Sequence, residues 1–360
     1  MYNGCKQIFV KYRRTPMELQ DIRRIRLYRQ HLTDPADVET VIKDLCGIQA
    51  QIPTNVPHAL TIRTGAPVDP ETYGENLLKS WTIRGTIHDF HRDDLPLFKA
   101  DPKMYHAGDW FGWGGDALSD EGRTMWAQFI LEKVKGGMSL REELKEACME
   151  KGMTEAEAEC MFESWGGGLR EMCERSFLCY KANSRREFML CPDYTPMGVE
   201  AAEKVLLERY LRHYAPATLR DMAYYFGWNQ TKCRTVMKTL DCEIHSVKAD
   251  GKEYFRAGEL PGDVPEIPDC IFLAGFDPLM MGYEKKDGFF VPAESLRGIF
   301  NLQGMVMAPV LLGGTVAARW KITGKKLTVT CFRELTEREK RAVTDAAELL
   351  FLKITKFEFV

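Results

Sequence analysis

The 360-residue sequence predicts an α+β protein of three tandem winged helix-turn-helix modules followed by a C-terminal β-rich domain. Two observations predict this fold. Segments with the helical spacing of apolar residues, followed by short runs of β-branched or aromatic residues, occur three times before residue 258. Helices followed by a β-hairpin are the order of a winged helix-turn-helix. From residue 269 onward, closely spaced strand-like runs replace the helical pattern.

The predicted domain organisation has six segments: an N-terminal basic arm and helix (1–35), winged helix 1 (36–92), a helical connector (93–137), winged helix 2 (138–192), winged helix 3 (193–258) and the β-rich domain (269–360). Residues 1–34 contain eight Lys or Arg and three Asp or Glu, so the helix expected from Met17 is locally basic. Such a helix can be a solvated face or a surface for backbone phosphates, and the residues alone leave both open.

The first module is predicted from helix starts and β-branched residues. Helices are expected from Asp34-Pro35, over Val56 to Arg63, and from Asp69-Pro70 to about Lys79. The alternating stretch from Trp81 to Phe90 then predicts a strand or hairpin.

The second module repeats this order with clearer helix starts. Capping boxes at Ser139 and Thr154 predict two helices, and a third is expected around Leu169 to Arg175. Short strands at 177–180 and 187–190 follow, and the basic segment that joins them would be the tip of a wing.

The third module has the clearest pattern. A long helix from Gly198 to Tyr214 precedes a capping box at Thr218, and a tight turn leads into a basic helix over Gln230 to Leu240. Asp250-Gly251 then predicts the turn of a wing hairpin. In the β-rich domain, strands are expected at five places, a capping box at Thr336 starts a helix, and residues 355–360 can form a last strand; the five runs are 271–273, 289–291, 308–312, 315–322 and 327–332.

The composition excludes several classes of protein. Hydrophobic residues make up 45% and charged residues 28%, no apolar run approaches the ~20 residues of a membrane span, and Met1–Lys6 shows no signal peptide, so we expect a cytoplasmic protein. The net charge of -3 argues against indiscriminate nucleic-acid binding but allows a local basic surface. The 11 cysteines are scattered without a Cys-x-x-Cys pair, which predicts buried free thiols and no metal site.

The most informative short stretch runs from Leu45 to Gln51 and contains two glutamines. Gln49 and Gln51 are two residues apart, so in an extended chain their side chains would point the same way. Two amides on one side of a turn can hold a water or a polar ligand. On their own, most such pairs are simply solvated.

These residues together resemble the AlkZ/YcaQ-like family of winged-helix DNA glycosylases over roughly residues 17–335. The resemblance rests on seven stretches, in order and spacing: Arg26–Leu32, Leu45–Gln51, Trp81–His88, Pro216–Leu240, Leu273–Leu279, Gly282-Tyr283 and Pro309–Leu312 with Gly314. It implies tandem winged-helix modules and a β-rich part around a DNA-sized groove. It also implies that Gln49-Ala50-Gln51 is the catalytic Gln-apolar-Gln motif, where the other main branch of the family has Gln-apolar-Asp.

Chemistry explains how two neutral amides could suffice. Cleavage of an N-glycosidic bond passes through an oxocarbenium-like transition state, and a purine alkylated at N7 or N3 is cationic, so it leaves as a neutral base without a general acid. The enzyme then has only to hold a water below C1′. We expect Gln51 to position this water and Gln49 to bind the same water or the deoxyribose. Because no lysine stands out as a Schiff-base nucleophile, we expect a monofunctional glycosylase that needs no cofactor.

The expected partner is double-stranded DNA that carries alkylated bases, bound by a monomer. The predicted DNA contacts are basic residues of the N-terminal helix, the wings, the helix-turn-helix and the β-rich domain: Arg24, Arg84, His88, Arg185, Arg186, Lys232, Arg234 and Lys325. Each basic residue is at least as often plain solvated surface, and a histidine on a strand such as His88 is more often hydrogen-bonded structure than a catalyst. Asp277 is expected to form a turn.

Two other functions fit the same modules. A transcription regulator would use the winged helices to bind DNA without chemistry, although no leucine-rich dimerisation helix stands out. A protein scaffold would use them as packing units. An assay for abasic sites on methylated DNA separates the three: base release supports the enzyme, a footprint without release supports the regulator, and no DNA affinity supports the scaffold.

Overall fold

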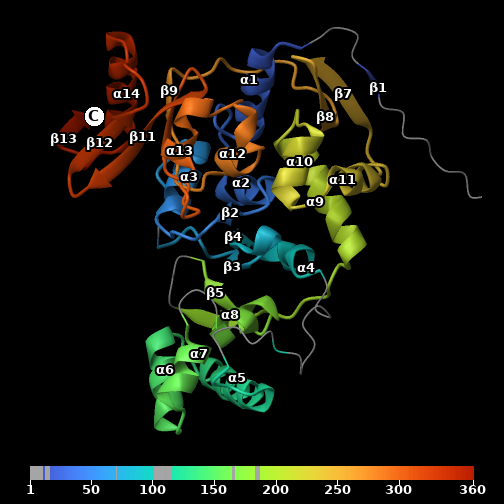
Figure 1. The fold of residues 1–360 in the computed structure, drawn as a ribbon, viewed down its shortest axis with the longest axis vertical. Helices are drawn as coiled ribbons and strands as arrows, with labels where there is room; N and C mark the ends of the chain where they lie inside the picture. Colours follow the sequence, from blue (N-terminus) through green and yellow to red (C-terminus); the bar gives the residue numbers. More distant parts are fainter. Residues whose placement is uncertain are drawn as a thin grey trace, which may run out of the picture. The chain divides into compact units, whose positions relative to one another are not determined.

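The computed structural model describes residues 11–12, 17–69, 71–100, 110, 116–163, 167–182 and 187–360 (Figure 1). The chain forms two compact units, which we call unit 1 (residues 1–68 and 203–360) and unit 2 (69–202). Each described cysteine is a free thiol; six are buried as predicted, and Cys191, Cys242, Cys270 and Cys331 are half-buried. Within the described ranges, no helix combines the length and the apolar character that crossing a bilayer requires.

Unit 1 contains the following helices: α1 (Leu19–Arg29), α2 (Val38–Asp44), α3 (Asn55–Thr64), α9 (Val199–His213, which begins in unit 2), α10 (Leu219–Phe226), α11 (Gln230–Met237), α12 (Pro278–Met281), α13 (Leu296–Ile299) and α14 (Glu337–Leu350). Its strands are β1 (Lys11–Tyr12), β2 (Ile48–Gln49), β7 (Ile244–Ala249), β8 (Lys252–Ala257), β9 (Cys270–Phe272), β10 (Pro309–Leu312), β11 (Thr315–Thr323), β12 (Lys326–Cys331) and β13 (Lys356–Phe359).

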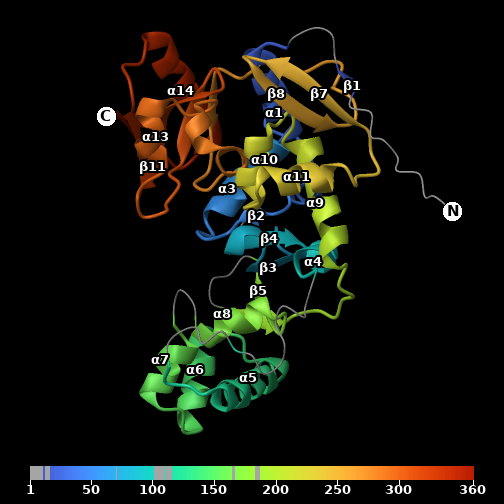
Figure 2. The same cartoon turned by 45° about the vertical axis from the view of Figure 1, so that its right-hand side comes forward.

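The predicted helix-turn-helix and its hairpin are present in unit 1. Thr218 and Asp221 form the capping box of α10, and the side chain of Asn229 caps α11. Strands β7 and β8 pair antiparallel around Asp250-Gly251, whose φ angles of 45° and 70° suit a two-residue hairpin. Strand β1 adds to β7 in parallel, as Figure 2 shows.

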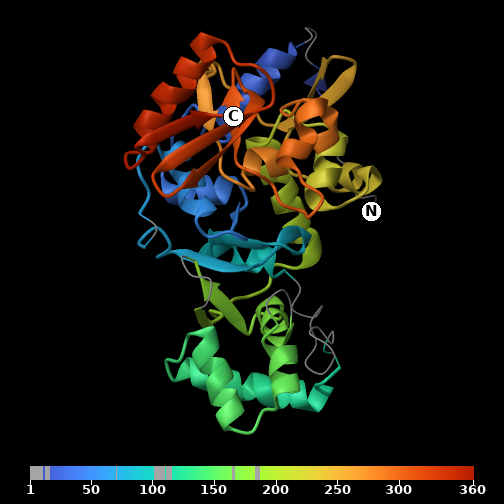
Figure 3. The same cartoon turned by 60° about the vertical axis from the view of Figure 1, so that its left-hand side comes forward.

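The C-terminal part of unit 1 is a five-stranded sheet covered by one helix. Strands β9 to β12 form an antiparallel meander, and β13 returns parallel to β12 after α14. Thr336 and Glu339 form the predicted capping box of α14. The helix lies along the sheet (Figure 3), and Val343 and Ala347 pack on a core that includes Phe272 and Val329.

Unit 2 combines a four-stranded sheet with a helical cluster. Its strands are β3 (Leu77–Trp81), β4 (Ile87–His91), β5 (Leu178–Lys181) and β6 (Phe188–Leu190), and its helices are α4 (Leu95–Phe98), α5 (Asp120–Lys135), α6 (Arg141–Glu150), α7 (Glu155–Met161) and α8 (Gly167–Glu174). The order β4-β3-β5-β6 joins both hairpins expected as wings into one antiparallel sheet. Trp126, Ile130, Leu144 and Met172 centre the helical core.

Three local predictions are wrong. Residues 71–76 form turns and β3 begins at Leu77, so no helix runs to Lys79; the buried pattern of β3 outweighs the apparent helical spacing. Residues 289–291 bend instead of forming a strand, because Phe289 packs against the guanidinium groups of α1. Leu140 instead of Ser139 is the N-cap residue of α6, since the Ser139 carbonyl accepts a bond from the Phe188 amide of β6.

Candidate functional site

The Gln-Ala-Gln stretch follows a sharp reversal at the end of α2. The Gly47 amide donates to the Ile42 carbonyl and the Cys46 amide donates to Lys43, which together form a Schellman motif. Cys46 and Gly47 both have positive φ, 57° and 83°. A non-glycine residue in this conformation is strained and is held by its surroundings. The chain therefore enters β2 in a fixed direction.

The two glutamines lie in different environments. Gln49 ends β2 with only 6% of its surface exposed, and the neighbouring Ala50 is 1% exposed. The Gln49 Oε1 atom is buried and accepts no hydrogen bond from the described part of the chain. Gln51 follows in a bend and is half-buried. Because an unpaired buried acceptor costs free energy, the Gln49 carbonyl is an open position for a hydrogen-bond donor.

A chain of hydrogen bonds anchors the turn before Gln49. The Gln30 amide donates to the Tyr283 hydroxyl over 3.0 Å, Tyr283 donates to the Tyr214 carbonyl, and the Tyr214 hydroxyl donates to the Leu45 carbonyl, both over 2.9 Å. A Cβ atom at Gly282 would meet the Tyr214 ring at 2.5 Å, so this position requires glycine. The motif at 282–283 thus supports the Gln turn from a distant part of the chain.

A buried ion pair fixes α3, which follows the Gln turn. Arg63 donates two hydrogen bonds to the Asp277 carboxylate, over 3.0 Å and 2.7 Å, and both side chains are fully buried. Asp277 also caps α12 through the Leu279 amide, so it does form the predicted turn and has this second role as well. No local pattern in the sequence links positions 214 residues apart.

The arginines of α1 bond within unit 1. Arg26 is buried against Asp221 and the Tyr283 ring, and Arg29 donates to backbone carbonyls of Arg212 and Glu259. Arg24, a predicted DNA contact, donates to the Val264 carbonyl and pairs with Glu266. These guanidinium groups therefore bond within unit 1. Neither a solvated face nor a phosphate-binding surface, the two interpretations of the basic helix, predicts this.

Of the other predicted DNA contacts of unit 1, one is paired with a carboxylate and two are exposed. Lys232 pairs with Glu203, and its ammonium lies 4.8 Å from the centre of the Trp228 ring. Arg234, on the same helix α11, is exposed. Lys325 is exposed at the turn between β11 and β12.

In unit 2, Arg84 and His88 belong to the β3–β4 hairpin. Arg84 has a positive φ of 62° in its turn. The His88 Nδ1 atom lies 2.8 Å from the Thr82 hydroxyl and 3.1 Å from the Thr86 carbonyl. Burial, together with the Arg84 charge, lowers the pKa of His88 to about 3, so its ring is neutral. Arg185 and Arg186 lie outside the described residues.

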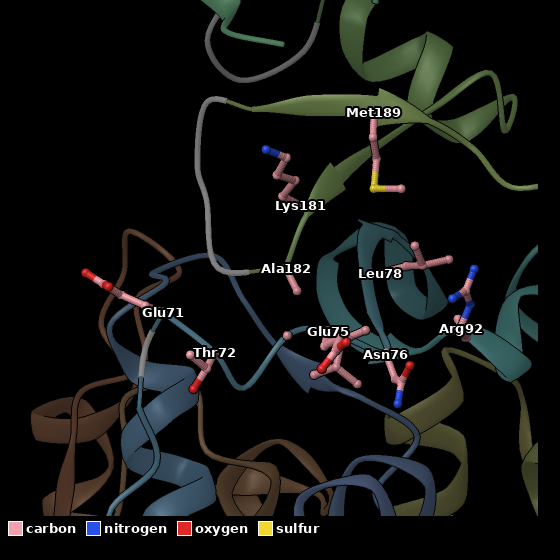
Figure 4. A pocket seen from close by; sticks show the side chains of 11 residues that line it. Glu71, Thr72, Glu75, Asn76, Leu78, Arg92, Lys181, Ala182 and Met189 are labelled. Carbon is pink, nitrogen blue, oxygen red and sulfur yellow. The ribbon is translucent and has the colours of Figure 1, made fainter. Parts of the chain in front are cut away.

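Unit 2 contains a second polar group, centred on buried Asp89, and a separate cavity. The Tyr73 hydroxyl donates to Asp89 over 2.7 Å, and burial raises the pKa of Asp89 to about 7. The cavity of about 430 Å³ lies between the turn at 71–76 and the strands β3, β5 and β6. Figure 4 shows Arg92 and Lys181 among its walls, with Glu75 and Met189. The sequence offered no signal for this cavity, because its lining comes from distant segments.

Comparisons with known proteins agree on one family. The model of a family described as DNA glycosylase AlkZ-like matches residues 42–351, a range that includes both glutamines. The interstrand DNA cross-link repair glycosylase of Streptomyces sahachiroi is 23% identical over 346 residues, which cover 89% of this chain and 92% of that protein. The solved structure of Streptomyces sahachiroi DNA glycosylase AlkZ matches with a TM-score of 0.74 and 20% identity, over 96% of this chain and 100% of the other. The mixed helix-and-sheet fold is thereby confirmed.

Proposed function

Because the chain belongs to the AlkZ-like family of DNA glycosylases, hydrolases of N-glycosyl bonds, we propose that it releases cationic purines alkylated at N7 or N3 from double-stranded DNA. The Streptomyces sahachiroi relative is named for interstrand cross-link repair, so cross-links formed through purine N7 atoms are included in the proposal. The observation that carries it is the buried, unpaired Oε1 atom of Gln49 beside half-buried Gln51.

The proposed mechanism needs a positioned water and no acid. Gln51, at the more accessible position, accepts a hydrogen bond from the attacking water, and Gln49 Oε1 accepts one from the same water or from the deoxyribose. As C1′ develops positive charge, both carbonyl dipoles stabilise it. The alkylated purine departs as a neutral base, and the proton that the water loses on bonding to C1′ passes to bulk water, so neutral amides suffice. Uracil and undamaged bases, which leave as anions, should be poor substrates.

The test compares base release by three variants of the full-length protein. Duplex DNA containing 7-methylguanine is incubated with wild type, Gln51→Ala and Gln49→Ala, and the released base is measured by chromatography. Loss of a group that positions a reactant can cost on the order of 10²-fold in rate, so we expect both variants to lose at least this much. Gln303→Ala, on an exposed loop, is the matched control and should keep the wild-type rate.

Two outcomes would contradict the mechanism. Equal rates for wild type and Gln51→Ala would remove this residue from the water site. Wild-type binding without any base release, from either the methylated or a cross-linked duplex, would favour the regulator. DNA affinity measured on the same variants distinguishes a catalytic defect from a binding defect.

We also infer that the α10–α11 pair with the β7–β8 hairpin acts as a winged helix on DNA, as do the two preceding predicted modules. Support comes from the observed capping and hairpin geometry of this third module. Arg234 and Lys325 are the exposed cations of unit 1 that this proposal uses as phosphate contacts.

A further inference from the structure

Three polar side chains from three helices of unit 1 converge just before the Gln turn. His31 follows the end of α1, Asp44 is the last residue of α2, and His213 is the last residue of α9. Asp44 Oδ2 lies 2.9 Å from His31 Nε2 and 3.2 Å from His213 Nδ1. The three candidate ligand atoms all lie within 4.8 Å of one another. We call these residues the His-Asp-His cluster.

The hydrogen-bonding pattern of His31 is that of a metal ligand. Its Nδ1 atom lies 3.3 Å from the Asp34 carbonyl oxygen, an acceptor, while Nε2 faces the Asp44 carboxylate, another acceptor. A neutral imidazole has only one N–H, so serving both acceptors takes either a second ring proton or a cation at Nε2. A cation between Nε2 and the carboxylate would satisfy both atoms, with Nδ1–H held by a backbone carbonyl as in many metal sites.

We propose that the His-Asp-His cluster binds a divalent transition-metal ion of the Zn²⁺ type and thereby fixes the start of the Gln turn. Two imidazoles and one carboxylate are ligands that Zn²⁺, Co²⁺ and Ni²⁺ accept, whereas Mg²⁺ and Ca²⁺ prefer oxygen. The ligand side chains are 13% to 24% exposed, and both histidines line a cavity of about 370 Å³, so water can complete the coordination. The sequence predicts no metal site, because the three ligands come from segments that lie far apart in the chain.

The position of the cluster gives the ion a structural role. Asp44 lies within the Schellman turn that leads to Gln49, and its two partners lie at the ends of α1 and α9. An ion would tie these three helix ends together at the base of the turn. The Tyr214 hydroxyl bond to the Leu45 carbonyl comes from the residue next to His213, so both anchors act on the same segment.

A second cluster serves as an internal control. Glu243, His245 and Glu259 also place ligand atoms within 4.8 Å of one another. Its carboxylates lie 3.5 Å and 3.7 Å from His245 Nε2, and their side chains are 43% and 81% exposed. With one nitrogen and two exposed carboxylates, this cluster offers a weaker site for a transition metal.

The experiment uses tag-free, chelator-treated full-length protein titrated with Co²⁺ and, separately, with Zn²⁺ in a calorimeter. We expect one ion per chain and a visible Co²⁺ spectrum without the intense sulfur-to-metal charge-transfer band of thiolate ligation. His31→Gln and His213→Gln keep a hydrogen-bond donor toward Asp44 but remove the imidazole ligand. Each should weaken Zn²⁺ binding at least tenfold, while His245→Gln should leave it unchanged.

Protection of the turn is the second readout. Zn²⁺ should slow amide hydrogen exchange at Cys46 and Gly47 in the wild type and not in His213→Gln. Three results would overturn the proposal: no binding by the wild type, binding unaltered in both glutamine variants, or a thiolate charge-transfer band. Because no step measures base release, failure here leaves the proposed glycosylase activity untouched, and loss of that activity leaves this site untouched.

Discussion

Gln49 in unit 1 and Asp89 in unit 2 are both buried polar residues, but only Asp89 can change its charge with pH. Gln49 is 6% exposed and Asp89 is fully buried. Each has one side-chain oxygen, Oε1 and Oδ1 respectively, with no hydrogen-bond partner among the described residues. Gln49 is neutral at every pH. Asp89 titrates, and burial raises its pKa to about 7.

The difference teaches why an amide suits the proposed site. An unpaired carboxylate in a buried position changes its protonation near neutral pH, so its acceptor strength depends on pH. An unpaired amide carbonyl keeps the same acceptor at every pH. Around the Gln turn, the buried cations Arg63 and Arg26 are paired with the carboxylates of Asp277 and Asp221 respectively. The Gln49 carbonyl is therefore surrounded by buried charges that cancel in pairs.

The largest expected effect comes from Asp277→Ala, which removes the buried carboxylate partner of Arg63. The fully buried Arg63 guanidinium would lose its partner, which typically costs about 3–5 kcal/mol of unfolding free energy. Urea denaturation followed by fluorescence measures it, and Asp277→Asn provides a milder variant if the alanine protein does not fold. Lys340→Ala, which breaks an exposed pair with Glu337 on α14, should leave the free energy of unfolding nearly unchanged, because solvent screens the pair. Similar losses in the two variants would show that burial does not decide the strength of the pair.

Asp89→Asn tests how the buried carboxylate makes the free energy of unfolding depend on pH. The folded-state pKa of Asp89, about 7, is above its ordinary 3.8, so the folded protein binds the extra proton and loses stability as pH rises toward 7. Between pH 5 and pH 8 this group should cost about 2–3 kcal/mol in the wild type and nothing in Asp89→Asn.

Tyr73→Phe is the matched control for this pH dependence. The Tyr73 hydroxyl bond lowers the pKa of Asp89, so its removal should move the loss of stability to higher pH. His88 is present in all three proteins, and its lowered pKa acts in the opposite direction at acid pH, so its contribution cancels in the differences. A wild-type pH profile identical to that of Asp89→Asn would contradict an ionisable, buried Asp89.

The sequence predicted the local features and missed the long-range pairings. Thr218 with Asp221 and Thr336 with Glu339 act within one turn, so their patterns were visible, as was the Asp250-Gly251 turn. The pair Gln49 and Gln51 is visible as two amides in one short stretch, and the family resemblance is what gives the pair a catalytic role.

What the sequence could not supply depends on segments far apart in the chain. The pairs Arg63–Asp277 and His31–His213 are set by packing, and no periodicity or spacing encodes them. The same reason applies to the basic helix α1. Its guanidinium groups donate to acceptors in distant loops, and no local pattern predicts these contacts.

Gln49→Met separates stability from chemistry at the proposed site. Methionine has a similar shape and no polar oxygen, so it removes the desolvated Oε1 atom, and the protein should gain about 1 kcal/mol of unfolding free energy. Base release from methylated DNA should fall by at least about 100-fold. Gln30→Met is the control, because Gln30 Oε1 is also unpaired but its amide donates to Tyr283. We expect no gain in stability there. A destabilised Gln49→Met protein would mean that Oε1 is already satisfied.

The smallest expected effect is on duplex binding by helix α11, which carries one paired and one exposed cation. Arg234 is exposed, whereas the Lys232 ammonium is paired with Glu203. If α11 contacts phosphates, Arg234→Ala should weaken duplex binding a few-fold and reduce the slope of log K against log salt by about 1. Lys232→Ala should change the slope less, because Glu203 already balances its charge. Fluorescence anisotropy at several salt concentrations measures both, and equal slopes for wild type and Arg234→Ala would place the phosphate contacts on another element.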